Sequence, residues 1–268
     1  MSAGKEAMLQ KNAERMSASS KAAAMVDDAQ EHSKTGNAFL DALSEDVRAS
    51  LAPKLRRIAV ARGDTVEDVD RPIDRVVFPL GSIVSLVTRM LDGGTVEVGI
   101  IGREGMSGLP IALGDGIAWQ HGFVQVADSA LCMDARDFES CLHEHPDLQA
   151  ACLRYARAVL SRTAQFAACN RLHPVNERCA RWLLMAHDRV PSDSFALTQE
   201  FLSDMLGVRR AGVSVAASAL QRAGLIDYRQ GQVTVLDRTT LESAACECYL
   251  AVEEDWQKTM GFSIRKTA

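Results

Sequence analysis

Two adjacent arginines, Arg209 and Arg210, begin a segment whose apolar residues recur at helical spacing. Ser214 and Ser218 follow Arg210 at intervals of four residues, so these three side chains would share one helical face. A guanidinium group can hold O6 and N7 of guanine through two parallel hydrogen bonds, and hydroxyl groups can contact bases or phosphates. Arginine and serine at the start of a helix therefore indicate a segment that reads DNA bases in the major groove.

The residues before these arginines predict the first of two short helices. Thr198 is a favoured N-cap residue, and Gly207 supplies the left-handed backbone that commonly ends a helix. Between them, four apolar residues recur at helical spacing: Phe201, Leu202, Met205 and Leu206. The second helix is expected from about Arg209 to Ala223. Its narrow inner face allows close packing on the first helix and consists of Val213, Ala216, Ala217 and Leu220.

A β-hairpin is predicted directly after the second helix. Beyond Gly224, the runs 225–228 and 233–235 alternate around Gln230-Gly231-Gln232. Two helices joined by a tight turn and followed by a hairpin form a winged helix-turn-helix, which indicates a DNA-binding regulator. Helical pairs joined by glycine also occur without DNA binding, so the rest of the chain bears on this interpretation.

Composition and charge limit the classes of protein that fit. The chain has 268 residues, of which 47% are hydrophobic, and this suggests two domains that can each bury a core. The formal net charge of −5 argues against a general affinity for nucleic acid, so contact with DNA needs a local basic patch. Such a patch occurs between 209 and 229, where four arginines accompany a single aspartate: Arg209, Arg210, Arg222 and Arg229, with Asp227.

Two features favour a cytoplasmic protein. No run of about eighteen apolar residues could span a membrane, and the first residues lack the apolar core of a signal peptide. The cysteine count is seven, an odd number with no Cys-x-x-Cys pair, which fits reduced thiols better than disulfides.

A change of residue types along the chain predicts the N-terminal half. Residues 1–36 are rich in Ala, Ser, Lys and Glu and are expected to form a flexible tail. A short amphipathic helix follows at 37–51. Between 55 and 134, short β-branched runs separated by turn signals predict an antiparallel barrel or sandwich, within a domain at 37–144. The runs are Arg57–Ala61, Val76–Phe78, Ser82–Met90, Val96–Ile101, Phe123–Val126 and Ala130–Met133.

A long helix is predicted over 145–172. Its residues at intervals of four and three are apolar except for one arginine: Leu148, Cys152, Tyr155, Val159, Arg162, Phe166 and Cys169. This heptad pattern predicts pairing with another helix, most simply the same helix of a second copy, although a singly buried helix with a wide apolar face would also show it. A second face is expected to pack on the barrel: Leu153, Ala156, Leu160, Ala164 and Ala167.

Two further helices complete the predicted order. The helix Val175–Val190 should begin the DNA-binding domain at 173–240, with Arg178 and Arg181 pointing outward. The segment 241–268 should hold a helix at 241–256 and a loose tail.

This order of barrel, long helix and winged helix-turn-helix resembles the Crp/Fnr family of bacterial transcription regulators. The resemblance covers about 37–237 and is most marked in VEVGIIGREGMSGLPIALG (96–114), VNERCARWLLMAHDRV (175–190) and TQEFLSDMLGVRR (198–210). It implies an α+β fold with an N-terminal antiparallel β-barrel, a cyclic-nucleotide-binding-like jelly roll, then a long dimerisation helix and a C-terminal winged helix-turn-helix. It also implies a homodimer on a two-fold symmetric operator in double-stranded DNA, with RNA polymerase as a further partner.

The resemblance also assigns residues to DNA. Thr198 and Gln199 stand where the family's first helix touches phosphate, and Arg210 stands where the family reads guanine. The neighbouring position, usually glutamate, is Ala211, and the second reading arginine is replaced by Val215. The operator should therefore differ from the family's best-known site. Our hypothesis is that Arg209 compensates.

The same resemblance argues against control by cyclic AMP or cyclic GMP. The family's binding cassette runs from Gly-Glu to Arg-Ser/Thr-Ala and supplies an acid for the ribose and an arginine for the phosphate. Here the glutamate position is Met106, and no arginine lies between Gly105 and Asp128. His121 is the one plausible cation left, which makes it a weak candidate for binding an effector of unknown identity.

The sequence predicts no metal, no other cofactor and no catalysis. No cysteine precedes Cys132, whereas iron–sulfur members of the family hold their cluster near the N-terminus. Five cysteines are separated along the chain and are expected to be buried small hydrophobes: Cys132, Cys141, Cys152, Cys169 and Cys179. Cys246-x-Cys248 is too tight for usual zinc spacing and should place its thiols on opposite sides of a helix, with redox sensitivity as the alternative.

Other functional classes fit the sequence less well. His143-Glu144-His145 could approach a metal, but a solvated helix end fits better because no further ligand can be assigned to it. Catalytic motifs such as Gly-x-Ser-x-Gly, His-Glu-x-x-His and the phosphate-binding loop are missing, so an enzyme is not expected. The alternative to a regulator is a ligand- or protein-binding signalling module with weakened DNA specificity, which the residues Ala211, Gly212 and Val215 favour.

Overall fold

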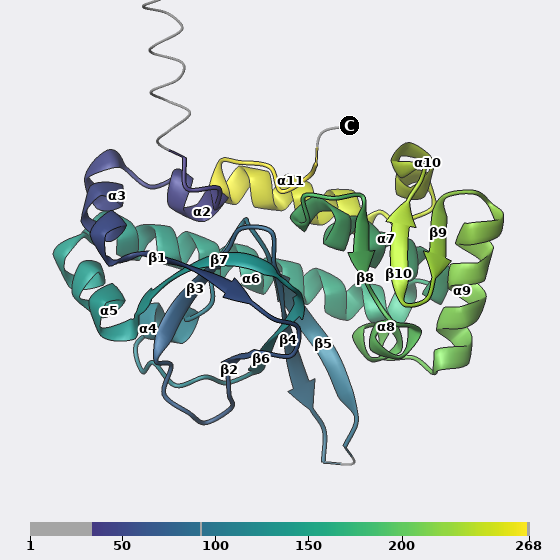
Figure 1. Ribbon diagram of the computed structural model, residues 1–268, viewed down its shortest axis with the longest axis horizontal. Coiled ribbons are helices and arrows are strands. Elements are labelled where there is room, and N and C mark those ends of the chain that lie inside the picture. Colours follow the sequence, from purple (N-terminus) through teal and green to yellow (C-terminus); the bar gives the residue numbers. More distant parts are fainter. Residues whose placement is uncertain (1–33, 92, 267–268) are drawn as a thin grey trace, which may run out of the picture. The chain divides into compact units, whose positions relative to one another are not determined.

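The structure is a computed structural model that describes residues 34–91 and 93–266. The predicted flexible tail at 1–36 therefore lies outside the described residues except for its last three positions. From Asn37 onward the chain forms one compact unit of two antiparallel sheets, a long helix and a helix-turn-helix with a small sheet (Figure 1). No helix of this described part combines the length and the apolar character needed to cross a lipid bilayer.

Two antiparallel sheets form the N-terminal half. One has the order β1-β7-β3 and the other the order β2-β6-β4-β5. The strands are β1 Arg56–Val60, β2 Thr65–Glu67, β3 Arg75–Pro79, β4 Ile83–Arg89, β5 Thr95–Ile101, β6 His121–Val126 and β7 Asp128–Asp134. Val60 and Val66 pack against the apolar clusters of both sheets and join them.

The predicted alternative of a sandwich fits better than a closed barrel, because no ladder joins the two sheets among the described residues. The edge strand β2, which sequence analysis missed, is three residues long, and its register on β6 shifts between Thr65 and Glu67. A bulge of this kind bends a strand and ends its pairing. The six strands that the sequence predicted are confirmed, and each of their ends agrees within one or two residues.

Short helices cover one end of the sandwich. They are α2 Ala38–Asp41, α3 Glu45–Leu51, a 3-10 turn at Ala52–Lys54, α4 Leu109–Leu113 and α5 Ala135–Glu144. The single helix predicted at 37–51 is thus two helices, since α2 ends at Ala42 and Ser44 begins α3. Asn37 is fully buried, and its amide donates to the carbonyl groups of Pro79 and Gly105 at 2.9 Å. This side chain fixes the start of α2 to the sandwich.

The long helix α6 (Pro146–Leu172) is confirmed, but its heptad face packs inside the chain, as the alternative of a singly buried helix predicts. Leu148, Tyr155 and Arg162 of the heptad face are buried inside the chain, against α5, β5 and the C-terminal helix α11 (Cys248–Met260). Leu153 and Leu160, assigned to the sandwich, are 50% and 71% exposed. The heptad pattern is real, but its helical partner is α11 of the same chain.

The C-terminal half contains α7 Val175–Arg189, β8 Ser194–Ala196, α8 Gln199–Leu206, α9 Arg210–Arg222, β9 Ile226–Arg229 and β10 Gln232–Val235. The hairpin is confirmed, and its turn at Gln230 and Gly231 has positive φ at both residues, as a type I′ turn requires. β8, an unpredicted strand, pairs with β10 to widen the wing to three strands.

Two expectations for this half are wrong. Arg178 and Arg181, predicted to point outward from α7, are only 6% and 3% exposed. Arg178 donates to the Leu206 carbonyl of α8, and the guanidinium of Arg181 lies 4.0 Å from the centroid of the Phe166 ring of α6. The helix predicted at 241–256 is two helices, α10 Arg238–Ser243 and α11, separated by a turn at 244–247. The tail beyond α11 is also packed, since Ile264 is buried and its amide donates to Glu253.

Buried charges connect the sandwich to α7. Arg189 at the end of α7 donates from Nε to Oε1 of Glu104 at 2.9 Å, and its Nη2 lies 2.8 Å from the same oxygen. Arg162 of α6 lies 3.6 Å from Glu104, and all three side chains are at most 2% exposed. A second contact runs from Trp182 Nε1 to Glu97 Oε1 at 2.7 Å. The position of α7 on the sandwich is therefore set by two carboxylates in or just after β5.

We expect Glu104→Gln to lower the free energy of unfolding by about 3–5 kcal/mol, because it leaves two buried guanidinium groups without a compensating charge. Urea denaturation measures this. Arg56→Gln is the control, since Arg56 pairs with Asp134 at 3.2 Å on the surface and its side chain is 66% exposed. This substitution should cost less than about 1 kcal/mol. Equal losses for the two variants would contradict the role of the buried cluster.

Glu97 should make stability depend on pH. Burial raises the pKa of its carboxyl from the ordinary 4.5 to about 7, against the lowering effect of hydrogen bonds from Trp182 and Ser85. The folded protein thus holds this proton more tightly than the unfolded chain, so its contribution is largest below pH 4.5 and is lost as the pH rises through 7.

We therefore expect Glu97→Gln to gain stability relative to the native protein between about pH 5 and about pH 8, as measured by urea denaturation at both values. The exposed Glu254, paired with Lys258 at 3.8 Å, gives the control variant Glu254→Gln, which should show no such trend. A stability difference between Glu97→Gln and the native chain that stays constant with pH would refute the assignment.

Candidate nucleic-acid interface and effector cavity

The helix-turn-helix is built as its sequence predicts. The Thr198 hydroxyl accepts a hydrogen bond from the Phe201 amide at 3.1 Å and caps α8, and Gly207 ends α8 with a φ of +60°. Ser214 of α9 donates to Oε1 of Gln199 at 2.7 Å, which ties the first turn of α8 to α9. Two of the predicted DNA-contacting residues, Gln199 and Ser214, are therefore joined to each other.

The outer face of α9 carries the other predicted contacts. Arg209, Arg210 and Ser218 are exposed. Val215, which stands where the resemblance places a second reading arginine, is 69% exposed. The start of the helix therefore offers two guanidinium groups to a partner, and its middle offers an apolar side chain.

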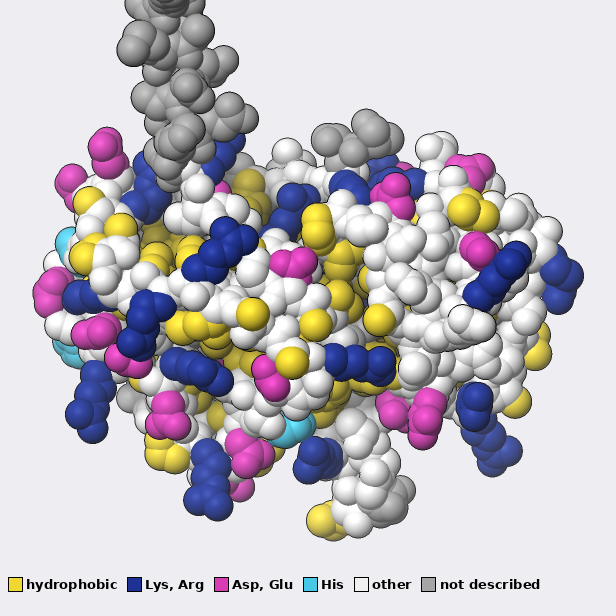
Figure 2. Space-filling model, viewed as in Figure 1, with side chains coloured by type: hydrophobic (Ala, Val, Ile, Leu, Met, Phe, Trp, Pro, Cys, Tyr) yellow, Lys and Arg dark blue, Asp and Glu magenta, His cyan; other side chains and the backbone are white. Residues whose placement is uncertain are grey.

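The predicted basic patch is weaker at the wing than at the helix. Arg229 pairs with Asp227 at 2.9 Å, so the one aspartate of the segment neutralises it. Arg222 is exposed in the last turn of α9. Lys and Arg side chains are interspersed with Asp and Glu over the face of the molecule seen in Figure 2. Any attraction for DNA therefore depends on the local pair at Arg209 and Arg210.

Gly212 occupies an open position in α9. A Cβ built on it would meet no atom within 4 Å, so packing inside the chain does not require glycine there. The residue lies two positions after Arg210, where a groove-binding helix approaches its partner most closely.

The helix-turn-helix also packs on the sandwich. The ring of Phe201 in α8 meets Phe123 of β6 edge-on, with ring centroids 5.9 Å apart. The guanidinium of Arg62 lies 5.8 Å from the centroid of the same Phe201 ring. With α8 on the sandwich, α9 lies on the far side of the helical pair (Figure 1).

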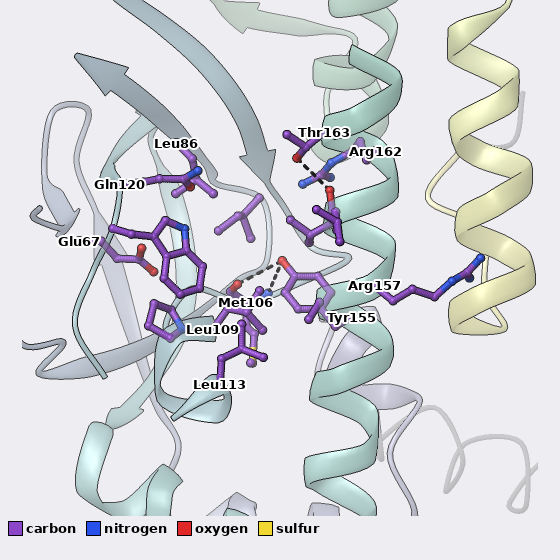
Figure 3. Close-up of a pocket in the computed structure, with 16 residues that line it drawn as sticks. Glu67, Leu86, Met106, Leu109, Leu113, Gln120, Tyr155, Arg157, Arg162 and Thr163 are labelled. Carbon is purple, nitrogen blue, oxygen red and sulfur yellow. Dashed lines mark hydrogen bonds between the residues drawn. The ribbon is translucent and has the colours of Figure 1, made fainter. Parts of the chain in front are cut away.

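A cavity of about 420 Å³ lies between the sandwich and α6 (Figure 3). Its wall is mainly apolar. Lining residues from the sandwich and α4 include Glu67, Leu86, Met106, Leu109, Trp119 and Gln120, and those from α6 include Tyr155, Leu160, Arg162 and Thr163. Met106, which stands at the glutamate position of the resembled family, is one of these lining residues.

Several polar groups of the cavity are committed to the protein, but the guanidinium nitrogens of Arg162 have no hydrogen-bond partner among the described residues. The Tyr155 hydroxyl donates to the Met106 carbonyl at 3.1 Å and accepts from the Met106 amide at 3.3 Å. Glu67 accepts from the Gly108 amide at 2.6 Å, and burial raises the pKa of its carboxyl. Arg157 points away from the cavity toward α11, where it meets Asp255 at 3.1 Å (Figure 3).

Of the residues singled out from the sequence for this domain, Met106 lines the cavity and His121 does not. The lining residues of α6 were not predicted. His121 lies 3.4 Å from Asp68 and stacks near Phe123, and it is not among the lining residues, although its neighbours Trp119 and Gln120 are. Met106, singled out at the family's glutamate position, is a buried lining residue. The contributions of α6 were missed because its heptad face was assigned to a second chain.

The cysteines need a correction. All seven are free and buried, as expected for small hydrophobes. Cys169, Cys246 and Cys248 are nevertheless not isolated, because they meet at the end of α6 together with His173. The predicted separation of Cys246 and Cys248 onto opposite sides of a helix fails, since α11 begins only at Cys248 and Cys246 lies in the preceding turn.

Comparisons with known proteins agree with this architecture. Residues 177–244 match the model of the Crp-like helix-turn-helix domain. No curated protein matches the sequence significantly.

Several solved structures share the fold. FixK2 from Bradyrhizobium japonicum is 15% identical, with 72% of this chain and 98% of that chain covered and a TM-score of 0.59. A transcriptional regulator of the CRP family from Thermus thermophilus is 21% identical over 71% and 96% of the two chains, with a TM-score of 0.57. CLP from Xanthomonas campestris, described as a c-di-GMP responsive global regulator, is 14% identical over 72% and 99%, with a TM-score of 0.56.

The resemblance seen in the sequence is thereby confirmed: the chain has the fold of Crp/Fnr-family transcription regulators and carries a Crp-like helix-turn-helix domain.

Proposed function

We propose that the protein is a cytoplasmic transcription regulator that binds a two-fold symmetric DNA operator as a homodimer and acts with RNA polymerase. The observation that carries this proposal is the exposed Arg209–Arg210 pair at the start of α9. The helix α9 is held to the capped helix α8 by the hydrogen bond from Ser214 to Gln199. Arg210 is proposed to read a guanine, Arg209 to supply a second cationic contact, and Thr198, Gln199, Ser214 and Ser218 to line the interface.

We infer that DNA binding does not require cyclic AMP. Support comes from the cavity, where the buried thioether of Met106 stands at the position of the family's acid. The position that supplies the family's acid for the ribose is thus apolar. Arg157 of the lining faces Asp255, whereas the guanidinium nitrogens of Arg162 have no hydrogen-bond partner among the described residues. The missing acid, and not the lack of a cation, is therefore what argues against a cyclic nucleotide.

Selection of binding sites from random duplex DNA, without added ligand, tests the function. We expect enrichment of a two-fold symmetric site. Arg210→Ala should then lose roughly 1–3 kcal/mol of binding free energy at that site and relax selectivity at one base pair per half-site. Arg136→Ala, which removes an exposed arginine from α5, serves as the control and should bind as the native chain does.

Two results would count against this assignment. An equal loss on all DNA sequences would remove the base-reading role of Arg210. No enrichment with the native protein, even when candidate effectors are added, would favour the alternative of a signalling module, which the exposed Ala211 and Val215 already favour.

The dimer interface should use the exposed face of α6. Leu153 and Leu160 lie two turns apart on this helix and are 50% and 71% exposed, while the heptad face is already covered by α11. We expect Leu160→Glu to convert the dimer to a monomer, because a carboxylate in an apolar helix seam is not compensated there. Analytical ultracentrifugation measures the mass. Leu250→Glu, at a 47% exposed leucine of α11, is the control and should stay dimeric. A Leu160→Glu protein that remains a dimer would move the interface elsewhere.

A further inference from the structure

Four metal-binding side chains meet where α6 ends. Cys169 belongs to the last turn of α6, His173 is the residue at which that helix stops, and Cys246 and Cys248 flank the turn into α11. The four ligand atoms, one from each residue, all lie within 4.8 Å of one another. Residues from two distant parts of the chain are therefore brought to one point.

Two of the separations between these atoms are close to those around a tetrahedral zinc ion. Zinc–sulfur bonds of about 2.3 Å and zinc–nitrogen bonds of about 2.0–2.1 Å imply tetrahedral separations of about 3.8 Å between sulfurs and about 3.6 Å between sulfur and nitrogen. The Sγ atoms of Cys169 and Cys246 are 3.5 Å apart, and Cys248 Sγ is 3.6 Å from Nδ1 of His173. The side chains thus need only a small adjustment to hold the ion.

Neighbouring groups orient the ligands as they do around known metals. Nε2 of His173 lies 3.0 Å from the carboxylate of Glu247, which favours a proton on Nε2 and leaves the lone pair of Nδ1 toward the sulfurs. Gln165 donates from Nε2 to Cys248 Sγ at 3.1 Å. A histidine held by a carboxylate on its outer nitrogen is a common arrangement in zinc sites.

Buried positive charge near the four ligands also favours thiolates. Arg178 and Arg181 of α7 are 6% and 3% exposed, and neither pairs with a carboxylate among the described residues. Their Nε atoms have no hydrogen-bond partner in that part of the chain. Three thiolates around a divalent ion carry a net charge of about −1, which would compensate this buried positive charge.

We propose that Cys169, His173, Cys246 and Cys248 form a structural zinc site. Three cysteines and one histidine are a ligand set of closed, tetrahedral zinc sites, whereas iron–sulfur clusters usually take four cysteines. The ion would fasten the turn before α11 to the end of α6, next to the first helix of the Crp-like domain. The zinc proposal does not depend on DNA binding. If the DNA-binding function is refuted, the zinc site can still stand, and the reverse is also true.

The test measures metal in the full chain, purified under reducing conditions without chelator. We expect one zinc per chain by mass spectrometry. Replacement by Co²⁺ should give near-ultraviolet thiolate-to-cobalt charge-transfer bands together with the strong visible d–d bands of a tetrahedral site. Cys246→Ala and His173→Gln should lose both the zinc and the bands. Cys152→Ala, a buried cysteine of the same helix, is the matched control and should keep both.

His173→Gln guards against a failure to fold, because the His173 side chain is 19% exposed and circular dichroism can verify its structure. Removal of zinc by a chelator should lower the melting temperature of the native chain and of Cys152→Ala, but not that of a folded His173→Gln protein. A native chain that binds neither Zn²⁺ nor Co²⁺ would overturn the proposal. Iron–sulfur absorbance in the purified protein, or a disulfide between Cys169 and Cys246 under these conditions, would overturn it as well.

Discussion

The carboxylate of Glu104 is the point at which the sandwich, α6 and α7 meet. It receives Arg189 from α7 and faces Arg162 from α6, with all three groups removed from water. Burying such charges costs several kcal/mol per ion, and only good geometry and further hydrogen bonds offset that cost. Arg189 meets this requirement by also donating to the Met185 carbonyl at 2.7 Å, and Glu104 by accepting from the Gly102 amide at 3.1 Å.

This cluster explains the residues around Glu104. A Cβ at Gly102 would overlap the side chain of Arg189, and a Cβ at Gly105 would overlap the ring of Tyr155. Neither glycine has a positive φ, so close approach and not backbone conformation accounts for them. The glycine-rich run after β5 is therefore a docking surface for α6 and α7. The same run supplies Met106 to the cavity.

The cavity and the DNA-binding half consequently share a residue network. Arg162 and Tyr155 line the cavity, and Arg162 shares Glu104 with Arg189 at the end of α7. A ligand in the cavity can change the DNA-binding helices only if it binds one arrangement of this cluster more tightly than another. Because Arg162 lines the cavity, a bound ligand can contact this cluster directly and favour one of its arrangements.

Local signals predicted most of the fold, and long-range contacts account for the rest. Thr198, Gly207 and the pair Gln230-Gly231 act through their own backbone, so their roles could be found in the sequence. The gathering of the cysteines could not, because it depends on the segment after the wing returning to α6. The burial of Arg178 and Arg181 could not either, because it depends on how α8 and α6 pack against α7. Helical periodicity identifies an apolar face but does not identify its partner.

The position of α11 shows why the partner of an apolar helix face matters. Trp256 of α11 packs edge-on against Tyr155 with ring centroids 5.8 Å apart, and Arg162 lies 5.4 Å from the centroid of a Trp256 ring. These are the heptad positions of α6 that a second chain would otherwise need to cover. Because α11 occupies them, the C-terminal segment also contacts Arg162 of the buried charge cluster. It also leaves Leu153 and Leu160 as apolar residues of α6 that a partner can reach. The C-terminal helix therefore determines which face of α6 remains available for association.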